Sequence, residues 1–293
     1  MNGTRIRIAA ALLLVAGAIA YVAMTVAQKA GVPGDEDWAQ AAAAVRAGWQ
    51  EGDLVVFSPA WAHAGAPVLR GLAADVAEQW DWYQASKHRR VWVVASRPHR
   101  EPEPPEGWQA VSRTEAGRMT VHLWTPPADR TLAWEGMETL HDASVFRGDG
   151  TSRQPCTTWQ DGRWSCGAAH PWQNVAPVSR DIAGRQRRVI WAHARDNGDP
   201  LEIRWTGVPE GRTLTVHVGL TQRAIEQDTG APVVFEVRLG DRVAVRRTID
   251  IHESGWFRHD IDIAGKGPQD VTIRVVARRN QDRQLCFTAD VWR

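Results

Sequence analysis

The sequence lacks several features that commonly reveal a function. It has no excess of either charge, because 35 Lys and Arg face 34 Asp and Glu, for a net charge of +1. This balance gives no electrostatic basis for binding nucleic acid, so we expect no nucleic-acid partner. The sequence contains no phosphate-binding loop, no H-E-x-x-H or C-x-x-C motif and no EF-hand loop. It therefore predicts no nucleotide cofactor and no catalytic metal.

A nucleophile motif is also missing. Ser58, His63 and Asp75 supply the residue types of a hydrolytic triad near a predicted strand end, but no G-x-S-x-G elbow surrounds the serine. Ser58 precedes Pro59, which favours a turn that ends the strand. We therefore expect no catalytic residues. The alternative, an enzyme acting on envelope polysaccharide, needs a site between two domains.

One hydrophobic run is long enough to cross a membrane. Residues 8–28 are 21 uncharged residues, and Arg5 and Arg7 precede them. About 20 apolar residues at a rise of 1.5 Å cover the roughly 30 Å hydrocarbon core of a bilayer. Basic residues before the run and the acidic residues 35–37 after it place the short N-terminus in the cytoplasm. Residues 1–30 are therefore predicted to be a single-pass anchor in the cytoplasmic (inner) membrane, with the remainder on the periplasmic or extracellular side.

The alternative for the same run is a cleaved signal peptide. The run is longer than the usual h-region of about 7 to 15 residues, and no clean small-x-small cleavage site precedes Lys29. Both interpretations export the rest of the chain. The 32 Arg against 3 Lys indicate a bacterial genome rich in G and C, so the expected location is a bacterial envelope.

Residues 35–127 alternate between helix and strand signals. The signals follow in the order helix, strand, helix and strand, at 37–52, 53–57, 67–83 and 90–95. The two strand segments are short continuous apolar runs, which are typical of buried parallel strands. An edge pair is expected at 109–111 and 118–124. Together these predict a small three-layer α/β domain.

Residues 130–293 change to a period of two. Apolar and polar residues alternate at 201–206, 214–220, 233–239, 243–249, 256–263, 271–277 and 285–291. Short strands at regular spacing with no helix between them predict an antiparallel β-sandwich of the jelly-roll type. The fold class is thus α/β plus all-β. The last stretch contains Cys286, which we expect to be a buried structural thiol.

A disulfide is predicted between Cys156 and Cys166. If Gly162 takes the left-handed position of a three-residue hairpin loop, Trp159 pairs with Arg163 and the two cysteines lie opposite each other. That pair falls on a non-hydrogen-bonded site, where the Cα atoms are about 4.5 Å apart and a disulfide can form. A two-residue type I′ turn would shift the register by one residue and separate the sulfurs. A disulfide fits the exported compartment.

Part of the α/β segment resembles a known family. Asp37-Trp38 followed by an Ala-rich helix, then residues 52–61 (GDLVVFSPAW) and 90–94 (RVWVV), is similar to the extracytoplasmic α/β domain of polytopic membrane glycosyltransferases that use lipid-linked sugars. The resemblance implies a membrane glycosyltransferase as a partner. It carries over no activity, because those enzymes hold their catalytic acidic residues in a multi-helix membrane part that this chain lacks.

The C-terminal half resembles a galactose-binding-like or carbohydrate-binding jelly roll. The resemblance rests on residues 234–243, 255–263 and 269–274, a strand and hairpin, a tryptophan-led strand and a D-V-T-I-R strand. It implies a non-catalytic protein that binds glycan or lipid-linked saccharide, or serves as accessory to a membrane glycosyltransferase. The alternative from another class is a structural envelope subunit whose sandwich mediates protein contacts.

Sugar-binding sandwiches combine an aromatic side chain that stacks on a pyranose with a few polar groups that bind hydroxyls. The hairpin and the residues that follow it offer such a set: Trp159, Trp164, His170, Trp172 and Asn174. In the structural alternative, Trp159 makes a cross-strand cation–π pair with Arg163 and Trp172 fills the end of the sandwich.

Trp256 is a further candidate for a ligand contact. It opens a predicted strand in which Phe257 and Ile261 share the parity of the core. Trp256 is then expected to face outward together with Arg258 and Asp260.

Two dipeptides, each with one aspartate, are candidates for a structural calcium site. They are His141-Asp142 and Asp149-Gly150, near the start of the sandwich. Calcium sites are common in jelly-roll folds, so the resemblance suggests this ion. The spacing of the residues gives little support of its own.

Overall fold

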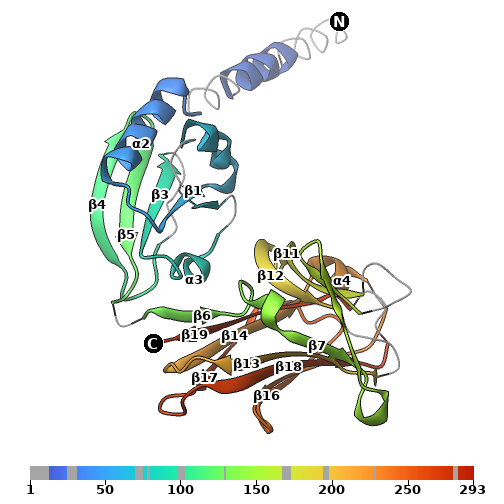
Figure 1. Cartoon of the computed structure of the whole chain (residues 1–293). Helices are drawn as coiled ribbons and strands as arrows, with labels where there is room; N and C mark the ends of the chain where they lie inside the picture. The colour runs from blue at the N-terminus through green and yellow to red at the C-terminus, as the bar shows by residue number, and fades with distance from the viewer. Residues whose placement is uncertain are drawn as a thin grey trace, which may run out of the picture. The chain divides into compact units, whose positions relative to one another are not determined.

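The computed structural model describes residues 13–24, 32–69, 75–77, 80–97, 103–128, 130–166, 173–193, 198–227, 229–279 and 283–293. The chain divides into two compact units, Met1–Pro127 and Ala128–Arg293 (Figure 1).

The N-terminal residues 13–24 are helical, and their side chains are exposed. Across the described ranges, none of the helices has both the length and the hydropathy that a bilayer crossing requires. The predicted anchor also includes residues 8–12 and 25–28, which lie outside those ranges.

The first unit is built on a five-stranded mixed sheet with the order β2-β1-β3-β5-β4. The strands are β1 (Asp53–Ser58), β2 (Asp75–Ala77), β3 (Arg90–Ser96), β4 (Gln109–Ala116) and β5 (Met119–Thr125). β1 pairs in parallel with β2 and β3, while β5 is antiparallel to both β3 and β4. Every residue of β1 is buried, as its uninterrupted apolar run predicts for a strand covered on both faces.

Each face of this sheet has its own apolar cluster. Val55, Phe57 and Val94 pack against helix α2 (Asp35–Gly48) and the 3₁₀ segment η1 (Ala60–Leu69). The opposite face, with Leu54, Val56, Val91 and Val93, packs against Ala85 of the short helix α3 (Trp82–Ala85) and four tryptophans, Trp80, Trp82, Trp108 and Trp124. The ring of Trp82 lies 4.9, 4.7 and 6.2 Å from those of the other three, each edge to face. Because α3 is only one turn long, the tryptophans supply most of this third layer.

The helix predicted over 67–83 is wrong. In its place the chain forms the end of η1, then β2 and finally α3. Pro67 lies inside η1, where its ring removes a backbone donor that a continuing α-helix needs. β2 is extended because it pairs with the free edge of β1, with Leu54 opposite Asp75 and Val56 opposite Ala77. The predicted edge pair is confirmed, since β4 and β5 pair with each other at one edge of the sheet, although β4 extends beyond the predicted 109–111.

A buried carboxylate joins three elements of the first unit. Asp53 accepts hydrogen bonds from Arg90 Nε at 2.8 Å and from Trp92 Nε1 at 2.8 Å, both on β3. It also accepts from the backbone N–H of Gln50 at 2.9 Å, while Arg90 Nη2 donates to the Gly48 carbonyl at 2.7 Å. The pair therefore ties β1 and β3 to the C-terminal end of α2. Such a pair is costly to break, because the remaining charge is left buried.

The second unit is a sandwich of two antiparallel sheets. The six-stranded sheet has the order β16 (Arg242–Ile249), β15 (Val233–Leu239), β18 (Gln269–Ala277), β13 (Leu201–Val208), β7 (Ser144–Arg147) and β8 (Gln154–Pro155). The eight-stranded sheet has the order β17 (Phe257–Asp262), β14 (Thr213–Leu220), β19 (Leu285–Trp292), β12 (Arg185–Ala192), β11 (Asn174–Ile182), β10 (Arg163–Ser165) and β9 (Thr158–Gln160), and β6 (Leu132–Glu135) pairs with β19.

The connections are those of a jelly roll. From β13 to β19, each consecutive pair of strands changes sheet except the β15–β16 hairpin. The inner faces form one core from alternate residues such as Ile203, Val216, Phe235, Ile273 and Phe287. The predicted antiparallel sandwich is confirmed by this arrangement.

Other elements of the second unit differ from the prediction. A short helix, α4 (Gln222–Glu226), follows β14, where no helix was expected, and the Thr221 hydroxyl caps it by accepting from the Ala224 N–H at 3.2 Å. β11 and β12 were not predicted as strands. Pro177 interrupts the apolar pattern of β11, and the first half of β12 is arginine-rich.

We expect Asp53→Ala to lower the free energy of unfolding by about 3 kcal/mol, because it leaves Arg90 without its buried partner. Chemical denaturation of the full chain measures this effect. The control is Glu115→Ala, whose partners Arg97 and Arg113 are exposed, and which should change the same quantity by about 0.5 kcal/mol or less. Equal effects of the two substitutions would contradict the role given to Asp53.

Candidate functional site

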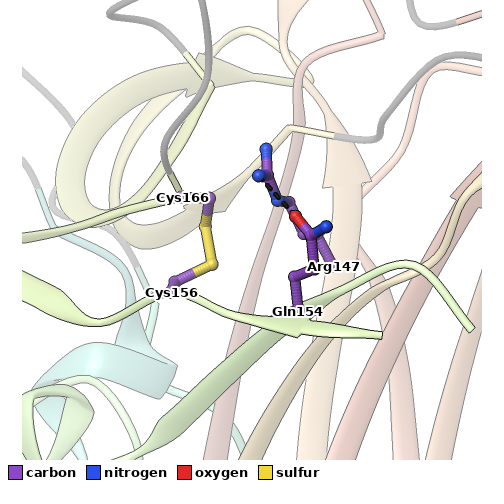
Figure 2. Close-up of a disulfide and its surroundings, with 4 residues drawn as sticks. All are labelled: Arg147, Gln154, Cys156 and Cys166. Carbon is purple, nitrogen blue, oxygen red and sulfur yellow. Dashed lines mark hydrogen bonds between the residues drawn. A yellow bond between two sulfur atoms is a disulfide. The ribbon is translucent and has the colours of Figure 1, made fainter. Parts of the chain in front are cut away.

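The predicted disulfide is present, but the predicted hairpin register is wrong. Cys156 and Cys166 are bonded, with their Cα atoms 4.2 Å apart (Figure 2). Trp159 lies opposite Trp164 rather than Arg163. Asp161 and Gly162 take φ values of 51° and 71°, so they form a two-residue turn in which both residues are left-handed.

The shifted register does not separate the sulfurs, because the hairpin ladder ends before it reaches them. Its last pair is Thr158 with Ser165, and Thr157 is an extra residue on one side. The backbone N–H of Cys156 donates to the carbonyl of Val145 in β7 at 2.8 Å. The chain has therefore left the hairpin at Cys156 and lies beside the six-stranded sheet, so the disulfide links the hairpin to that sheet.

The two hairpin tryptophans occupy different environments. Both are half-buried and pack against the sandwich core. The indole Nε1 of Trp164 donates to the Leu140 carbonyl at 2.9 Å, so this side chain is held by the scaffold. The ring of Trp159 has tilted neighbours, Trp164 at 5.5 Å and 60° and His141 at 6.4 Å and 51°. Neither of these rings stacks flat on Trp159.

Polar groups lie beside Trp159. His141 and Asp142 belong to the 3₁₀ turn η2 (Leu140–Asp142), and His141 Nε2 lies 3.2 Å from Asp142 Oδ1. Their side chains are 55% and 67% exposed. An aromatic ring next to an exposed imidazole and carboxylate is the combination that binds a sugar face and its hydroxyls. The sequence contained both residues, but nothing in it indicated that η2 would contact the hairpin.

The other candidates near the hairpin are only partly described. His170 and Trp172 lie outside the described residues. Asn174 is the first residue of β11, lies opposite Ser165 of β10 and is half-buried. The structure therefore brings Trp159, Trp164 and Asn174 to the same end of the eight-stranded sheet.

Trp256 lies just before β17, away from the hairpin strands. Phe257 and Ile261 pack into the main core, whereas Trp256 packs against a separate cluster on the outer face of the eight-stranded sheet. Its ring stacks on His217, with centroids 5.6 Å apart and planes 10° apart. The Arg187 guanidinium lies 5.5 Å from the same ring. Two side chains of the protein itself thus already engage Trp256.

That separate cluster contains Cys286, whose burial as a free thiol was predicted. It consists of Ile182, Val189, Trp191 and Cys286, with Val178 and Trp256 packed against them. β12 pairs with β19 only at Ile190 and Trp191, and a Cβ on Gly219 of β14 would lie 3.0 Å from Ile182 Cγ2. The β11–β12 hairpin therefore curls over the outer face of the sheet. Burial beneath it raises the pKa of the Cys286 thiol to about 12.

A polar group on the same face lies along β17. Asp260 is partly desolvated, which raises its pKa, but hydrogen bonds from Thr215 Oγ1 at 2.7 Å and Arg258 Nε at 3.0 Å outweigh this effect. The pKa of Asp260 is therefore lowered, and its carboxylate is ionised at neutral pH.

In the part of the chain that the structure describes, no three His, Cys, Asp or Glu side chains converge on a common metal position. The two calcium candidates lie in separate 3₁₀ turns, η2 and η3 (Gly150–Ser152). The Asp149 carboxylate accepts from the Gly150 N–H at 2.8 Å and from Arg274 Nη2 at 2.9 Å.

No protein-family model matches the chain, and no curated protein resembles it in sequence. Solved structures resemble part of it. One is CBM51 from Clostridium perfringens GH95 in complex with methyl-galactose, at 17% identity over 40% of this chain and 81% of that one, with a TM-score of 0.29. Another is the carbohydrate-binding module TmCBM27, studied for mannan recognition, at 11% identity over 57% and 99%, with a TM-score of 0.32.

A third structure contains the CBM51-2 and INT domains of Clostridium perfringens ZmpB in complex with GlcNAc. It shares 12% identity over 64% of this chain, with a TM-score of 0.34, and this chain spans 41% of its length. Similarities this low transfer no ligand. The assignment of the sandwich rests on its strand pairing.

Counting thiols tests the disulfide in solution. In denaturant without reductant we expect one alkylated cysteine, Cys286, and after reduction we expect three. In the native protein Cys286 should resist alkylation at pH 8, because its burial keeps the thiol protonated. Mass spectrometry after iodoacetamide treatment reads all three states. Three labelled cysteines without reductant would contradict the disulfide.

Proposed function

We propose that this protein is a non-catalytic saccharide-binding protein of the bacterial envelope, and that Trp159 is the aromatic residue on which the sugar stacks. The observation that carries the proposal is the position of Trp159 beside the exposed His141–Asp142 pair. A pyranose has one apolar face and a rim of hydroxyls, so it needs an aromatic surface with donors and acceptors at its edge. This end of the sandwich supplies both.

The rigidity of the hairpin supports the same site. The disulfide anchors one end of the hairpin, and the hydrogen bond from Trp164 to Leu140 fixes the residue directly opposite Trp159. A ring that is already positioned loses little conformational freedom when a ligand binds. We assign Trp164 and the disulfide to the scaffold, and Trp159 and His141 to the ligand contact.

Trp256 is the weaker of the two aromatic candidates. His217 stacks parallel to its ring and the Arg187 guanidinium also lies near it, so a sugar would have to displace an internal partner. Among the described residues, the ring neighbours of Trp159 are tilted rather than stacked. This difference is the reason for placing the saccharide at the hairpin.

Calorimetric titration of the full chain tests the site. The protein is kept in a detergent without a sugar headgroup and is titrated with a panel of envelope oligosaccharides that includes a lipid-linked saccharide. We expect saturable binding by the wild type. Trp159→Ala should weaken it at least tenfold, equivalent to about 1.4 kcal/mol, through loss of the stacking surface. His141→Ala should weaken it by a smaller factor.

Trp256→Phe is the matched control, and we expect its affinity to stay within about twofold of the wild type. Near-ultraviolet circular dichroism verifies that each variant is folded. Loss of binding in Trp256→Phe with full binding in Trp159→Ala would overturn the placement of the site. An absence of saturable binding to any saccharide would overturn the function and favour the structural-subunit alternative.

The location and the partner are further parts of the proposal. The uncharged run 8–28 and the flanking arginines support an inner-membrane anchor with the two units on the periplasmic or extracellular side. The resemblance of residues 37–94 to a glycosyltransferase domain supports a membrane glycosyltransferase as the protein that this chain assists.

Alkaline carbonate extraction of cell membranes tests the anchor. We expect the full chain to stay in the membrane pellet, because an apolar segment of about 20 residues partitions into the bilayer. A variant that lacks residues 1–30 should be released. If the protein expressed from the full sequence is extracted into the supernatant, the result favours the cleaved signal peptide. Recovery of that protein without residues 1–30 would favour the same alternative.

A further inference from the structure

A buried arginine, Arg283, lies just before the last strand, β19. Arg283 is 0% exposed, and its side chain is the largest of the fully buried side chains in the described residues. Its Nη2 atom donates to the carbonyls of Ala224, at 2.8 Å, and Gln227, at 3.1 Å, and it also contacts the Thr229 carbonyl. Its Nη1 atom donates to the carbonyl of Ile251 at 3.2 Å. One side chain thus gathers four backbone carbonyls.

These carbonyls come from segments that are distant in sequence. Ala224 belongs to α4, Gln227 and Thr229 follow it, and Ile251 lies in the loop between β16 and β17. None of the four residues is part of a strand. Arg283 therefore holds together loops that no strand ladder connects.

Nη2 of Arg283 donates to more carbonyl oxygens than it has hydrogens. A guanidinium Nη carries two hydrogens, yet three carbonyl oxygens surround this atom. One hydrogen is therefore shared between two oxygens, and all three lie against the positively charged group. Several neutral oxygens that converge on one buried positive centre are also the arrangement that proteins use for hard cations such as calcium.

We propose that the carbonyls of residues 224, 227, 229 and 251 form a cation cage, and that the Arg283 guanidinium is the cation that fills it. The guanidinium stays charged at every physiological pH, so the cage is permanently occupied in the native protein. Without the side chain, the cage is a binding site for a small cation of the guanidinium or calcium class. This site is separate from the saccharide site and does not depend on it.

Thermal unfolding of the full chain with the variant Arg283→Ala tests the proposal. We expect its melting temperature to fall by about 5 °C or more, because buried carbonyls lose their partner. Low millimolar guanidinium chloride or calcium chloride should then raise the melting temperature of the variant, relative to sodium chloride at equal ionic strength. The wild type should show no such rise.

Arg247→Ala is the matched control. Arg247 is only partly buried, and its guanidinium pairs with the Glu253 carboxylate and lies over the Phe257 ring instead of binding carbonyls of several loops. We expect it to lose stability without any specific rescue by either cation. Rescue of both variants to the same extent, or of neither, would overturn the proposal.

A second pair of variants decides the matter if Arg283→Ala does not fold. Arg283→Lys keeps a positive charge with three donors, whereas Arg283→Met keeps similar length without charge. We expect the lysine variant to fold and to melt at a higher temperature than the methionine variant. Equal melting temperatures, or failure of both variants to fold, would show that the charge is not what the cage requires.

Discussion

The second unit depends on one constraint, which is that each strand from β13 to β19 must turn alternate residues toward a single core shared by two sheets. Ile203, Val216, Phe235, Ile273 and Phe287 meet there although they lie on five different strands. Burial of this apolar surface is the main favourable term in folding such a sandwich. Because most consecutive strands from β13 to β19 change sheet, a few neighbouring strands of this unit cannot bury their apolar sides alone, and the jelly-roll connections follow from that requirement.

The outer faces of the two sheets, unlike the inner faces, must be compatible with water. On the six-stranded sheet, Arg246, Glu236, Arg274 and Glu202 lie opposite one another in a row across four strands, so charges alternate in sign. The Glu236 side chain is only 3% exposed and lies 3.1 Å from Arg238 and 3.4 Å from Arg246. Arg283 shows a different use of the same residue type, because its guanidinium is fully buried and held by backbone carbonyls. Arginine suits both places because it is always charged and presents several donors in a fixed geometry.

Sequence reasoning succeeded where a single local pattern decides the structure. The period of two along β13 to β19 and the apolar runs of β1 and β3 are such patterns, and the predicted disulfide between Cys156 and Cys166 is also present. Sequence reasoning failed where contacts with residues distant in sequence determine the local structure. Residues 75–77 are extended because the edge of β1 is free to pair with them, and the Trp82 cluster covers a face for which a helix was expected. The hairpin register failed for a local reason, since Asp161 joins Gly162 in the left-handed region, a conformation that Asp adopts less often than Gly.

The candidate site illustrates the same limit. Trp159 and Trp164 are five residues apart and were singled out together, yet their roles differ because Trp164 donates to Leu140 and Trp159 lies beside His141. Both of these contacts reach η2, a turn about 20 residues away that has no periodic signal of its own. Strands as short as β9 and β10 would hold a ring only loosely. Because the disulfide ties their ends to β7, the aromatic ring and its polar neighbours keep one arrangement, and that fixed geometry is what separates a recognition site from an ordinary exposed tryptophan.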